Sequence, residues 1–294
     1  FFQAEDGIRD KLVTGVQTCA LPICCGELTE EMKMSGIFET AALGIQVDDY
    51  HIMDDENFDQ AEFLRRVAES PNCPKSNCPS PERYMESYHC DAERVYAVTL
   101  SSELSGSYNS AVLGKNLYKE EYGEKDIYVF NSRSASIGET LIGLKIEECE
   151  KVGMSFQEVV DTVEAYIAEQ HTYFVLENLE TLRKNGRLSG LKAMAASVLN
   201  IKPVMGSTPK GEIQQLAQMR GMRKATNKMA ELLAQEAINP AKKILAISHC
   251  NCPERAEQLK HAIMELIPIK DCILVDTRGI SSMYANDGGV IAVI

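Results

Sequence analysis

VYAVTLSSELSGSYNSA, residues 95–111, is the stretch of this chain that decides its fold. Its first six residues are apolar, aromatic or β-branched, which predicts a short buried strand. From about Ser105 the pattern becomes helical, because Ala111, Val112 and Leu117 fall on one face. A hydroxyl-rich turn joins strand and helix, and the backbone N–H groups at such a helix start suit an anion. In an open α/β sheet, this turn lies where ligands usually bind.

A second strand–turn–helix unit follows at once. Residues 126–131, DIYVFN, predict another buried strand, and the hydroxyl-rich NSRSAS leads into a helix. Two such units in succession indicate a parallel sheet with right-handed crossovers. Further along, helices alternate with strands of which two form a hairpin across GSTPKG. We therefore predict an α/β protein with a parallel-sheet α/β domain at residues 25–153 and an α+β domain at residues 154–294.

Local signals predict the remaining elements. Thr29, followed by two glutamates, opens a short helix, and residues 60–69 form an amphipathic one. Residues 48–59 read as a polar connection. Three prolines exclude regular structure in residues 71–80, and Pro81 is well placed to begin a helix. Residues 193–199 predict a small apolar helix.

The charge of the chain narrows the range of partners. The formal net charge is −13, which makes nucleic acid and anionic membrane surfaces poor partners. No apolar run approaches the roughly 20 residues that span a bilayer, so we expect no stable membrane insertion. These features predict a cytoplasmic protein.

The ten cysteines do not have the spacing of a disulfide scaffold. His249, Cys250 and Cys252 form the group most similar to a metal site, but SHCNC is one residue short of a CxxC pair and lacks a second pair. Reduced thiols without a metal are therefore the favoured interpretation.

Residues 1–24, FFQAEDGIRDKLVTGVQTCALPIC, show no sustained helical or strand period. Glu5, Asp6 and Asp10 interrupt the apolar core that a secretory signal needs. The segment resembles the translated sequencing-adapter peptide that contaminates assembled environmental genes. We therefore predict that residues 1–24 are an artefact outside the fold, with a disordered N-terminal arm as the alternative.

Four segments together resemble the DegV family of bacterial fatty-acid-binding proteins. They are PKSNCPSPERY (74–84), LSSELSGSYNSA (100–111), LETLRKNGRLSG (179–190) with LNIKPV (199–204), and RGISSMYANDGG (278–289). The resemblance implies two α/β domains with a tunnel between them that holds a long-chain fatty acid. Several members carry the acyl chain for a fatty acid kinase, which makes an acyl phosphate for phospholipid synthesis. It thus implies a binding protein without a cofactor, with a fatty acid kinase catalytic subunit as partner.

The resemblance also assigns candidate site residues. The family's carboxyl-holding hydroxyls fall on Ser76 and Ser105, with Asn77 and Ser107 beside them. Arg220 matches an arginine associated with the kinase step. Tyr284 stands where the family has a histidine, and tyrosine does not become cationic near neutral pH.

The two carboxyl motifs contain no cation except Lys75, so we expect hydroxyl and backbone dipoles to hold the head group. We expect apolar lining from residues 191–198 and from the core faces of the first domain.

Two other classes of function stay open. A stand-alone hydrolase needs a Ser or Cys nucleophile beside a histidine, and His249 is the histidine to test. The sequence has no GxSxG, no Walker-type GxxxxGK[ST] and no HExxH motif. A metal-binding protein built on His249, Cys250 and Cys252 is the other alternative.

Overall fold

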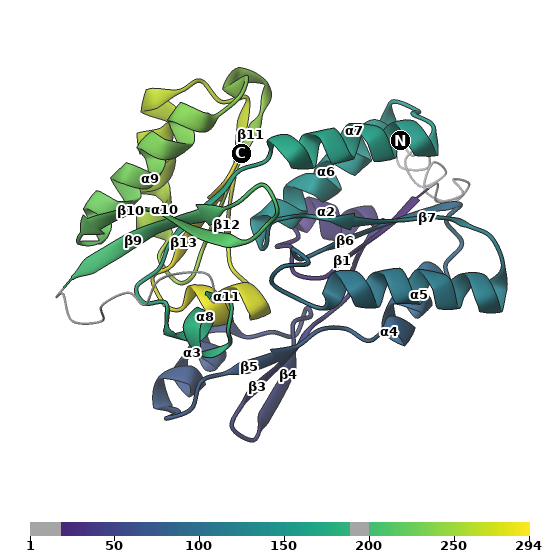
Figure 1. Cartoon of the computed structure of the whole chain (residues 1–294), viewed down its shortest axis with the longest axis horizontal. Helices are drawn as coiled ribbons and strands as arrows, with labels where there is room; N and C mark the ends of the chain where they lie inside the picture. The colour runs from purple at the N-terminus through teal and green to yellow at the C-terminus, as the bar shows by residue number, and fades with distance from the viewer. Residues whose placement is uncertain (1–18, 189–199) are drawn as a thin grey trace, which may run out of the picture.

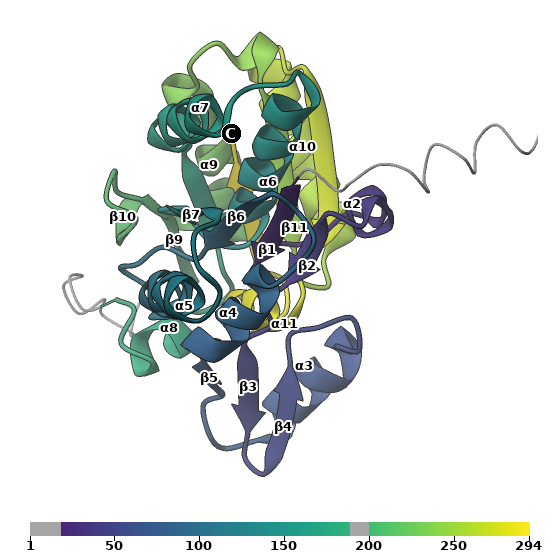
Figure 2. The same cartoon turned by 90° about the vertical axis from the view of Figure 1, so that its right-hand side faces the viewer.

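The computed structural model describes residues 19–188 and 200–294 and arranges them around three β-sheets. The first and second sheets lie beside each other, and the small third sheet projects below them (Figures 1 and 2). The predicted α/β class is confirmed. The helix predicted at residues 193–199 lies outside the described residues.

The first sheet is parallel throughout, with the strand order β2-β1-β6-β7. Its strands are β1 (Cys19–Ile23), β2 (Phe38–Thr40), β6 (Arg94–Thr99) and β7 (Asp126–Asn131). The strands predicted at residues 95–100 and 126–131 are confirmed as β6 and β7, and α5 (Ser107–Tyr122) connects them. Because the strands are parallel, the turns after β6 and β7 lie at the same side of the sheet, at the carboxyl ends of the strands.

Strand β1 contradicts the prediction that residues 1–24 lie outside the fold. Leu21 and Ile23 are 0% and 1% exposed, and β1 pairs with β2 on one side and β6 on the other. A strand buried on both faces needs a continuous apolar run rather than an alternating one. CALPI is such a run, so its sequence shows no strand period. The correction covers residues 19–24.

Helices cover both faces of the first sheet. On one face lie α4 (Pro81–Tyr88) and α5, and on the other α2 (Glu30–Ser35), α6 (Ile137–Lys151) and α7 (Phe156–Glu169). The predicted starts of α2 and α4 are confirmed, because Thr29 and Ser80 cap them and Pro81 occupies the first turn of α4.

The packing of α7 bears on the predicted domain boundary at residue 153. Val159, Val160, Val163 and Ile167 of this helix belong to the same core cluster as β1 and β6. The helix therefore packs with the first sheet although the predicted boundary assigns it to the second domain. This contact favours a boundary after Glu169.

The second sheet has the order β10-β9-β8-β13-β11-β12. Its strands are β8 (Thr172–Val175), β9 (Ile201–Ser207), β10 (Ile213–Arg220), β11 (Ile244–His249), β12 (Asp271–Asp276) and β13 (Val290–Val293). The predicted hairpin is confirmed as the antiparallel pair β9–β10. Helices α9 (Met222–Glu236) and α10 (Pro253–Leu266) pack on one face. On the other face, Ala246 and Val293 pack against Ile137 and Leu141 of α6, which joins the two halves.

The small third sheet has the order β4-β3-β5, formed by β3 (Gly44–Val47), β4 (Tyr50–Met53) and β5 (Lys75–Asn77). It contradicts two predictions. Residues 48–59 contain β4, whose residues alternate between exposed and half-buried, so it lacks an apolar signal. The proline-rich loop contains β5, because its three residues fit between Pro74 and Pro79. Helix α3 (Gln60–Glu69) matches its predicted range.

Three short helices complete the described chain: α8 (Glu180–Lys184), the 3₁₀ helix η1 (Pro240–Lys242) and α11 (Gly279–Ala285). Helix α11 was not predicted. Asp54, directly after β4, accepts the Ile280 N–H at 2.9 Å and so caps the start of α11. Gln60 of α3 donates to the Thr277 carbonyl oxygen at 2.7 Å, just before α11. The third sheet and α3 therefore hold α11 in place.

Candidate functional site

A cavity lies between the first and second sheets and encloses ≈ 870 Å³ of space, part of which is open to solvent. The turns after β6 and β7 form one wall, and β8, β9, β13 and α11 form the other. Most of the wall is apolar, with side chains that include Leu43, Leu100, Leu104, Phe174, Leu176, Leu182, Ile213, Ile280 and Ile291.

The hydroxyl groups of Ser76 and Tyr284 face each other in this wall, with their oxygens 3.4 Å apart. They lie 208 residues apart in the sequence. Ser76 lies in β5, where it pairs with Ile45 of β3, and Tyr284 lies near the end of α11. The link between the third sheet and α11 thus also aligns these two hydroxyls. Two predicted site residues are therefore brought together.

Ser105 also lines the cavity, in the turn before α5. Its hydroxyl oxygen accepts the Ser107 N–H at 3.2 Å and lies 2.9 Å from the Ser107 hydroxyl. Ser107 itself is fully buried and is absent from the cavity wall. The two serines therefore have different positions: Ser105 faces the cavity, and Ser107 orients it from behind.

Arg187 is a cavity residue that the sequence analysis missed as a candidate ligand. Its Nε–H donates to the Leu104 carbonyl oxygen at 3.2 Å, and its guanidinium carbon lies 5.9 Å from the centre of the Tyr284 ring. It brings a permanent positive charge close to Tyr284 and to the turn that carries Ser105. The expectation that hydroxyl and backbone dipoles hold the head group did not include this cation. Its position in NGRLSG, within one of the four segments that resemble the family, was the sequence feature that could have identified it as a candidate.

Two other predicted residues do not line the cavity. Asn77 follows Ser76 in β5, so its side chain points to the opposite face, where it packs over Gly44. Arg220 is exposed at the end of β10. It lies seven residues from the lining residue Ile213, or about 23 Å along the strand.

A second polar group lies in the same wall. The Ser136 hydroxyl donates to Glu27 Oε2 at 2.8 Å and lies 2.9 Å from the Ser248 hydroxyl. Ser281 of α11 lies 3.6 Å from the Cys25 thiol, oxygen to sulfur. Ser136, Ser281 and Cys25 line the cavity, and Glu27 lies behind them at 2% exposure. Burial raises the pKa of Glu27 to about 7.

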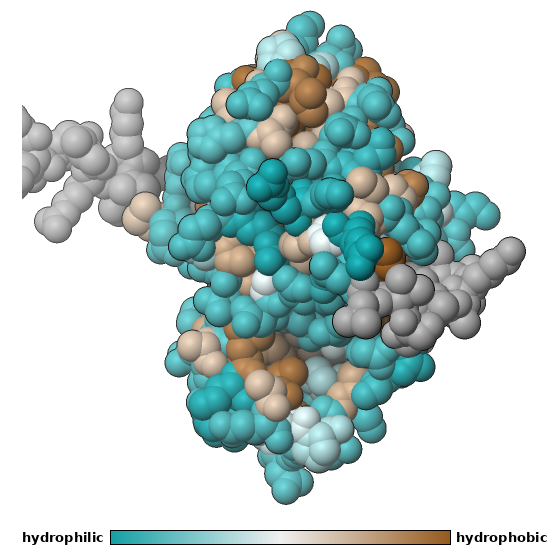
Figure 3. Space-filling view, turned by 90° about the vertical axis from the view of Figure 1, so that its left-hand side faces the viewer, coloured by the Kyte–Doolittle hydropathy of each residue, from teal (hydrophilic) through white to brown (hydrophobic). Residues whose placement is uncertain are grey.

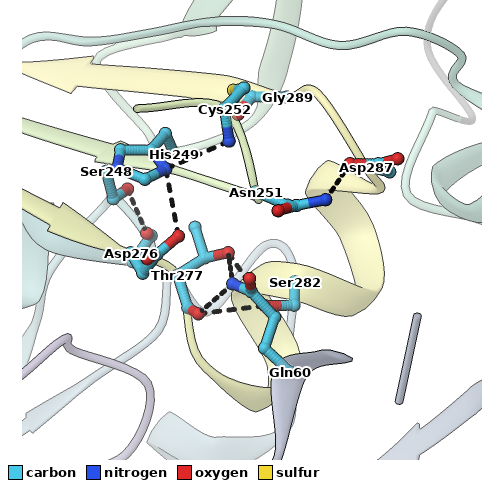
Figure 4. A network of polar contacts seen from close by, with 11 residues as sticks. Gln60, Ser248, His249, Asn251, Cys252, Asp276, Thr277, Ser282, Asp287 and Gly289 are labelled. Atoms are coloured by element: carbon cyan, nitrogen blue, oxygen red, sulfur yellow. Dashed lines mark hydrogen bonds and ion pairs between the residues drawn. The ribbon is translucent and has the colours of Figure 1, made fainter. Parts of the chain in front are cut away.

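The polar network around His249 bears on the two alternative functions (Figure 4). His249 Nδ1 lies 3.0 Å from Asp276 Oδ1 on the neighbouring strand and 3.4 Å from the Cys252 nitrogen. The Cys252 thiol is directed to the Gly289 carbonyl oxygen, and burial raises its pKa to about 11. The network therefore orients a histidine but provides no activated nucleophile beside it.

Within residues 19–188 and 200–294, no three His, Cys, Asp or Glu side chains are arranged to hold a metal ion. All ten cysteines fall in these ranges and are free thiols. In the same part of the chain, no helix is both long and apolar enough to cross a membrane. The view in Figure 3 shows a mostly hydrophilic face, with hydrophobic residues gathered in its lower half beside a hollow.

Comparisons with known proteins agree with this architecture. A family model described as "Uncharacterised protein, DegV family" matches residues 26–294. A DegV domain-containing protein of Streptococcus pyogenes serotype M1 is 34% identical over 254 residues, which are 86% of this chain and 90% of the relative.

Two similar solved structures contain fatty acids. The DegV family protein of Ruminococcus gnavus, with vaccenic acid, is 62% identical at a TM-score of 0.93, covering 95% of this chain and all of that one. The Fatty Acid Kinase B3 protein of Streptococcus pneumoniae, loaded with linoleic acid, is 30% identical at a TM-score of 0.83, covering 93% of this chain and 98% of that one.

Proposed function

Because the chain belongs to the DegV family, we propose that it binds a long-chain fatty acid in the cavity between its sheets. The observation that carries the proposal is the cavity wall itself, apolar over most of its area but with Ser76, Ser105, Tyr284 and Arg187 gathered at one part of it. A fatty acid has the same division between an apolar chain and one polar end.

The energetic balance supports a buried chain. A sixteen-carbon tail gains on the order of 12 kcal/mol at about 0.8 kcal/mol for each buried CH₂ group. Lost freedom of the ligand and the cavity wall opposes much of this gain. Burying the carboxyl group costs several kcal/mol unless hydrogen bonds replace its water. The hydroxyls of Ser76 and Ser105 supply such bonds, and Arg187 compensates the charge.

The test is to purify the full chain from a bacterial host and record its native mass spectrum before and after delipidation. The proposal expects a mass excess equal to a long-chain fatty acid, and expects the delipidated protein to bind hexadecanoic acid in a calorimetric titration. A protein that carries no lipid and takes up no hexadecanoic acid would contradict it.

We further propose that the chain presents the fatty acid to a fatty acid kinase partner. The support is the relative named Fatty Acid Kinase B3 protein and the position of Arg220, which is exposed and distant from the cavity. A cation in that position suits a partner or a phosphate rather than the bound carboxyl group.

Arg220→Ala is therefore expected to leave fatty acid affinity unchanged but to slow acyl-phosphate formation with a fatty acid kinase catalytic subunit and ATP. Tyr284→His, which restores the family's usual residue, should preserve or raise that rate. If neither wild type nor Tyr284→His supports phosphorylation while both bind the acid, the chain stores or delivers fatty acids instead.

A further inference from the structure

The polar group formed by Ser136, Ser281 and Glu27 has no role in holding a simple fatty acid. A saturated tail has no atom that can donate or accept a hydrogen bond, yet two hydroxyls line the cavity here. Ser134 and Thr172 in the same wall pair with each other at 2.6 Å, whereas the Ser136 hydroxyl is directed to the buried carboxyl group of Glu27.

Glu27 shows that this group is incompletely paired. Its Oε2 accepts the Ser136 hydroxyl at 2.8 Å, whereas its Oε1 has no hydrogen-bond partner. The residue is only 2% exposed, so bulk water does not solvate that oxygen. An acceptor left alone inside a protein is unfavourable, and a donor that reaches it gains correspondingly. The group therefore favours a ligand with a hydrogen-bond donor.

The position of the group relative to the proposed carboxyl site follows from α11. Ser281 and Tyr284 lie three residues apart on this helix, and both line the cavity. Residues with that spacing have Cβ atoms about 5–6 Å apart on one helix face. With the carboxyl group beside Tyr284, a chain that runs along α11 passes Ser281 with its first few carbons and not with its distal part.

We propose that the cavity selects long-chain acids with a hydroxyl group on carbon 2 or 3, bound by Ser281 and by Glu27 behind Ser136. The inference rests on the proposed function, because it takes the carboxyl group to lie beside Tyr284. The ligand hydroxyl donates a hydrogen bond to the unpartnered oxygen of Glu27 and accepts one from the Ser281 hydroxyl. A hydroxyl group placed far along the chain meets the apolar wall instead and loses its water without replacement.

The test measures the affinity of the delipidated full chain for four ligands by calorimetry: hexadecanoic, 2-hydroxyhexadecanoic, 3-hydroxyhexadecanoic and 12-hydroxyoctadecanoic acid. We expect 2- or 3-hydroxyhexadecanoic acid to bind at least about tenfold more tightly than hexadecanoic acid, the effect of one good buried hydrogen bond. The 12-hydroxy acid is expected to bind no more tightly than hexadecanoic acid.

Three variants connect the preference to the structure. In Ser281→Ala and Glu27→Gln, the affinities for the hydroxylated and the plain acid should differ by less than about threefold. Ser134→Ala, which alters a cavity serine paired with Thr172 instead, should retain the preference. Should Glu27→Gln fold poorly, Ser281→Ala alone decides the question.

Equal affinities for the hydroxylated and plain acids, or a preference that persists in Ser281→Ala, would overturn the inference and leave fatty acid binding intact. Absence of binding by all four acids would instead remove the proposed function.

Discussion

Ser76 and Ser105 test the proposed carboxyl site at the scale of single residues. Both hydroxyls line the cavity, so each alanine variant should leave part of the ligand's carboxyl group without a partner. We expect Ser76→Ala and Ser105→Ala each to weaken hexadecanoic acid binding by about 1–3 kcal/mol, measured by calorimetry. Ser207→Ala is the matched control, because Ser207 lines the cavity from β9. Equal affinities in all three variants would place the carboxyl group elsewhere.

Glu27 makes the stability of the protein depend on pH. Burial raises its pKa from 4.5 to about 7, so the folded protein holds a proton that the unfolded chain releases above pH 4.5. Burial also raises the pKa of Asp54 to about 6 and that of Glu139 well above its ordinary value. All three carboxyl groups therefore have a higher pKa in the folded protein than in the unfolded chain. The free energy of unfolding should therefore fall as the pH rises from about 4.5 to about 7.

Glu27→Gln should reduce that fall, because glutamine does not ionise. At pH 8 the variant is expected to be more stable than wild type by up to about 3 kcal/mol, the value of a shift of this size. Urea denaturation at pH 5 and pH 8 measures the difference. A wild-type protein that is more stable at pH 8 than at pH 5 would show that these buried acids do not dominate its pH dependence.

Single residues also show where prediction from sequence succeeds and fails. The motifs located Ser76, Ser105 and Tyr284, which all line the cavity. Asn77 does not line the cavity, because neighbouring residues of a strand point to opposite faces. The sequence did not indicate that β5 is a strand. Glu27 was missed because its importance depends on burial, and burial depends on contacts more than 100 residues away.

At the scale of elements, α11 provides a test of how the cavity wall is held. Asp54 caps this helix from the third sheet, and α11 carries Ile280, Ser281 and Tyr284 into the wall. Asp54→Ala should lower the free energy of unfolding by about 1–2 kcal/mol, the usual cost of a lost cap. It should also weaken hexadecanoic acid binding, because the wall becomes less ordered.

Ser155→Ala separates the two effects. Ser155 caps α7 by accepting the Glu158 N–H at 3.4 Å, but α7 packs on the first sheet and does not contribute to the cavity wall. The two variants should lose similar stability in thermal denaturation, whereas only Asp54→Ala should lose affinity. A parallel loss of affinity in Ser155→Ala would mean that general destabilisation causes the effect.

Elements with a strong local signal were predicted well. Helix α3 matches its predicted range because its apolar face and its capped first turn agree. The elements that were missed, β1, β4, β5 and α11, are short. Their residues become ordered through partners distant in the sequence, such as Asp54 for α11 and Val98 for β1. The secondary-structure propensity of a short segment does not indicate such distant contacts.

At the scale of the whole molecule, β1 allows a decisive truncation. A chain that starts at residue 19 keeps every described element, and it should show the circular dichroism and thermal transition of the full chain. A chain that starts at residue 25 loses β1, an inner strand of the first sheet, and with it the fully buried side chains of Leu21 and Ile23. Each such side chain contributes about 1.5–3 kcal/mol.

The shorter chain should therefore fail to fold, which reverses the expectation that residues 1–24 are dispensable. A cooperative transition in the chain that starts at residue 25 would show instead that another segment replaces β1.

The parallel pair β6–β7 and the antiparallel hairpin β9–β10 were predictable from the sequence, since β-turn-α units and hairpins have different patterns. The sheet on which α7 packs was not predictable, because an apolar helix face does not specify its partner, and the structure places that face in the core of the first sheet. Only the three-dimensional packing decides between the two sheets.

The position of β13 has a consequence for synthesis on the ribosome. This strand lies between β8 and β11 in the second sheet, although it follows every other strand in the sequence. Until it emerges, the sheet remains in two separate parts, β10-β9-β8 and β11-β12, each with an unpaired inner edge. Nascent chains thus expose the unpaired edge of β8, and later also that of β11, until β13 is made, and both edges are prone to aggregation. A product that terminates before Val290 cannot close the sheet, so proteolytic quality control should remove it rather than let it accumulate as a partly functional protein.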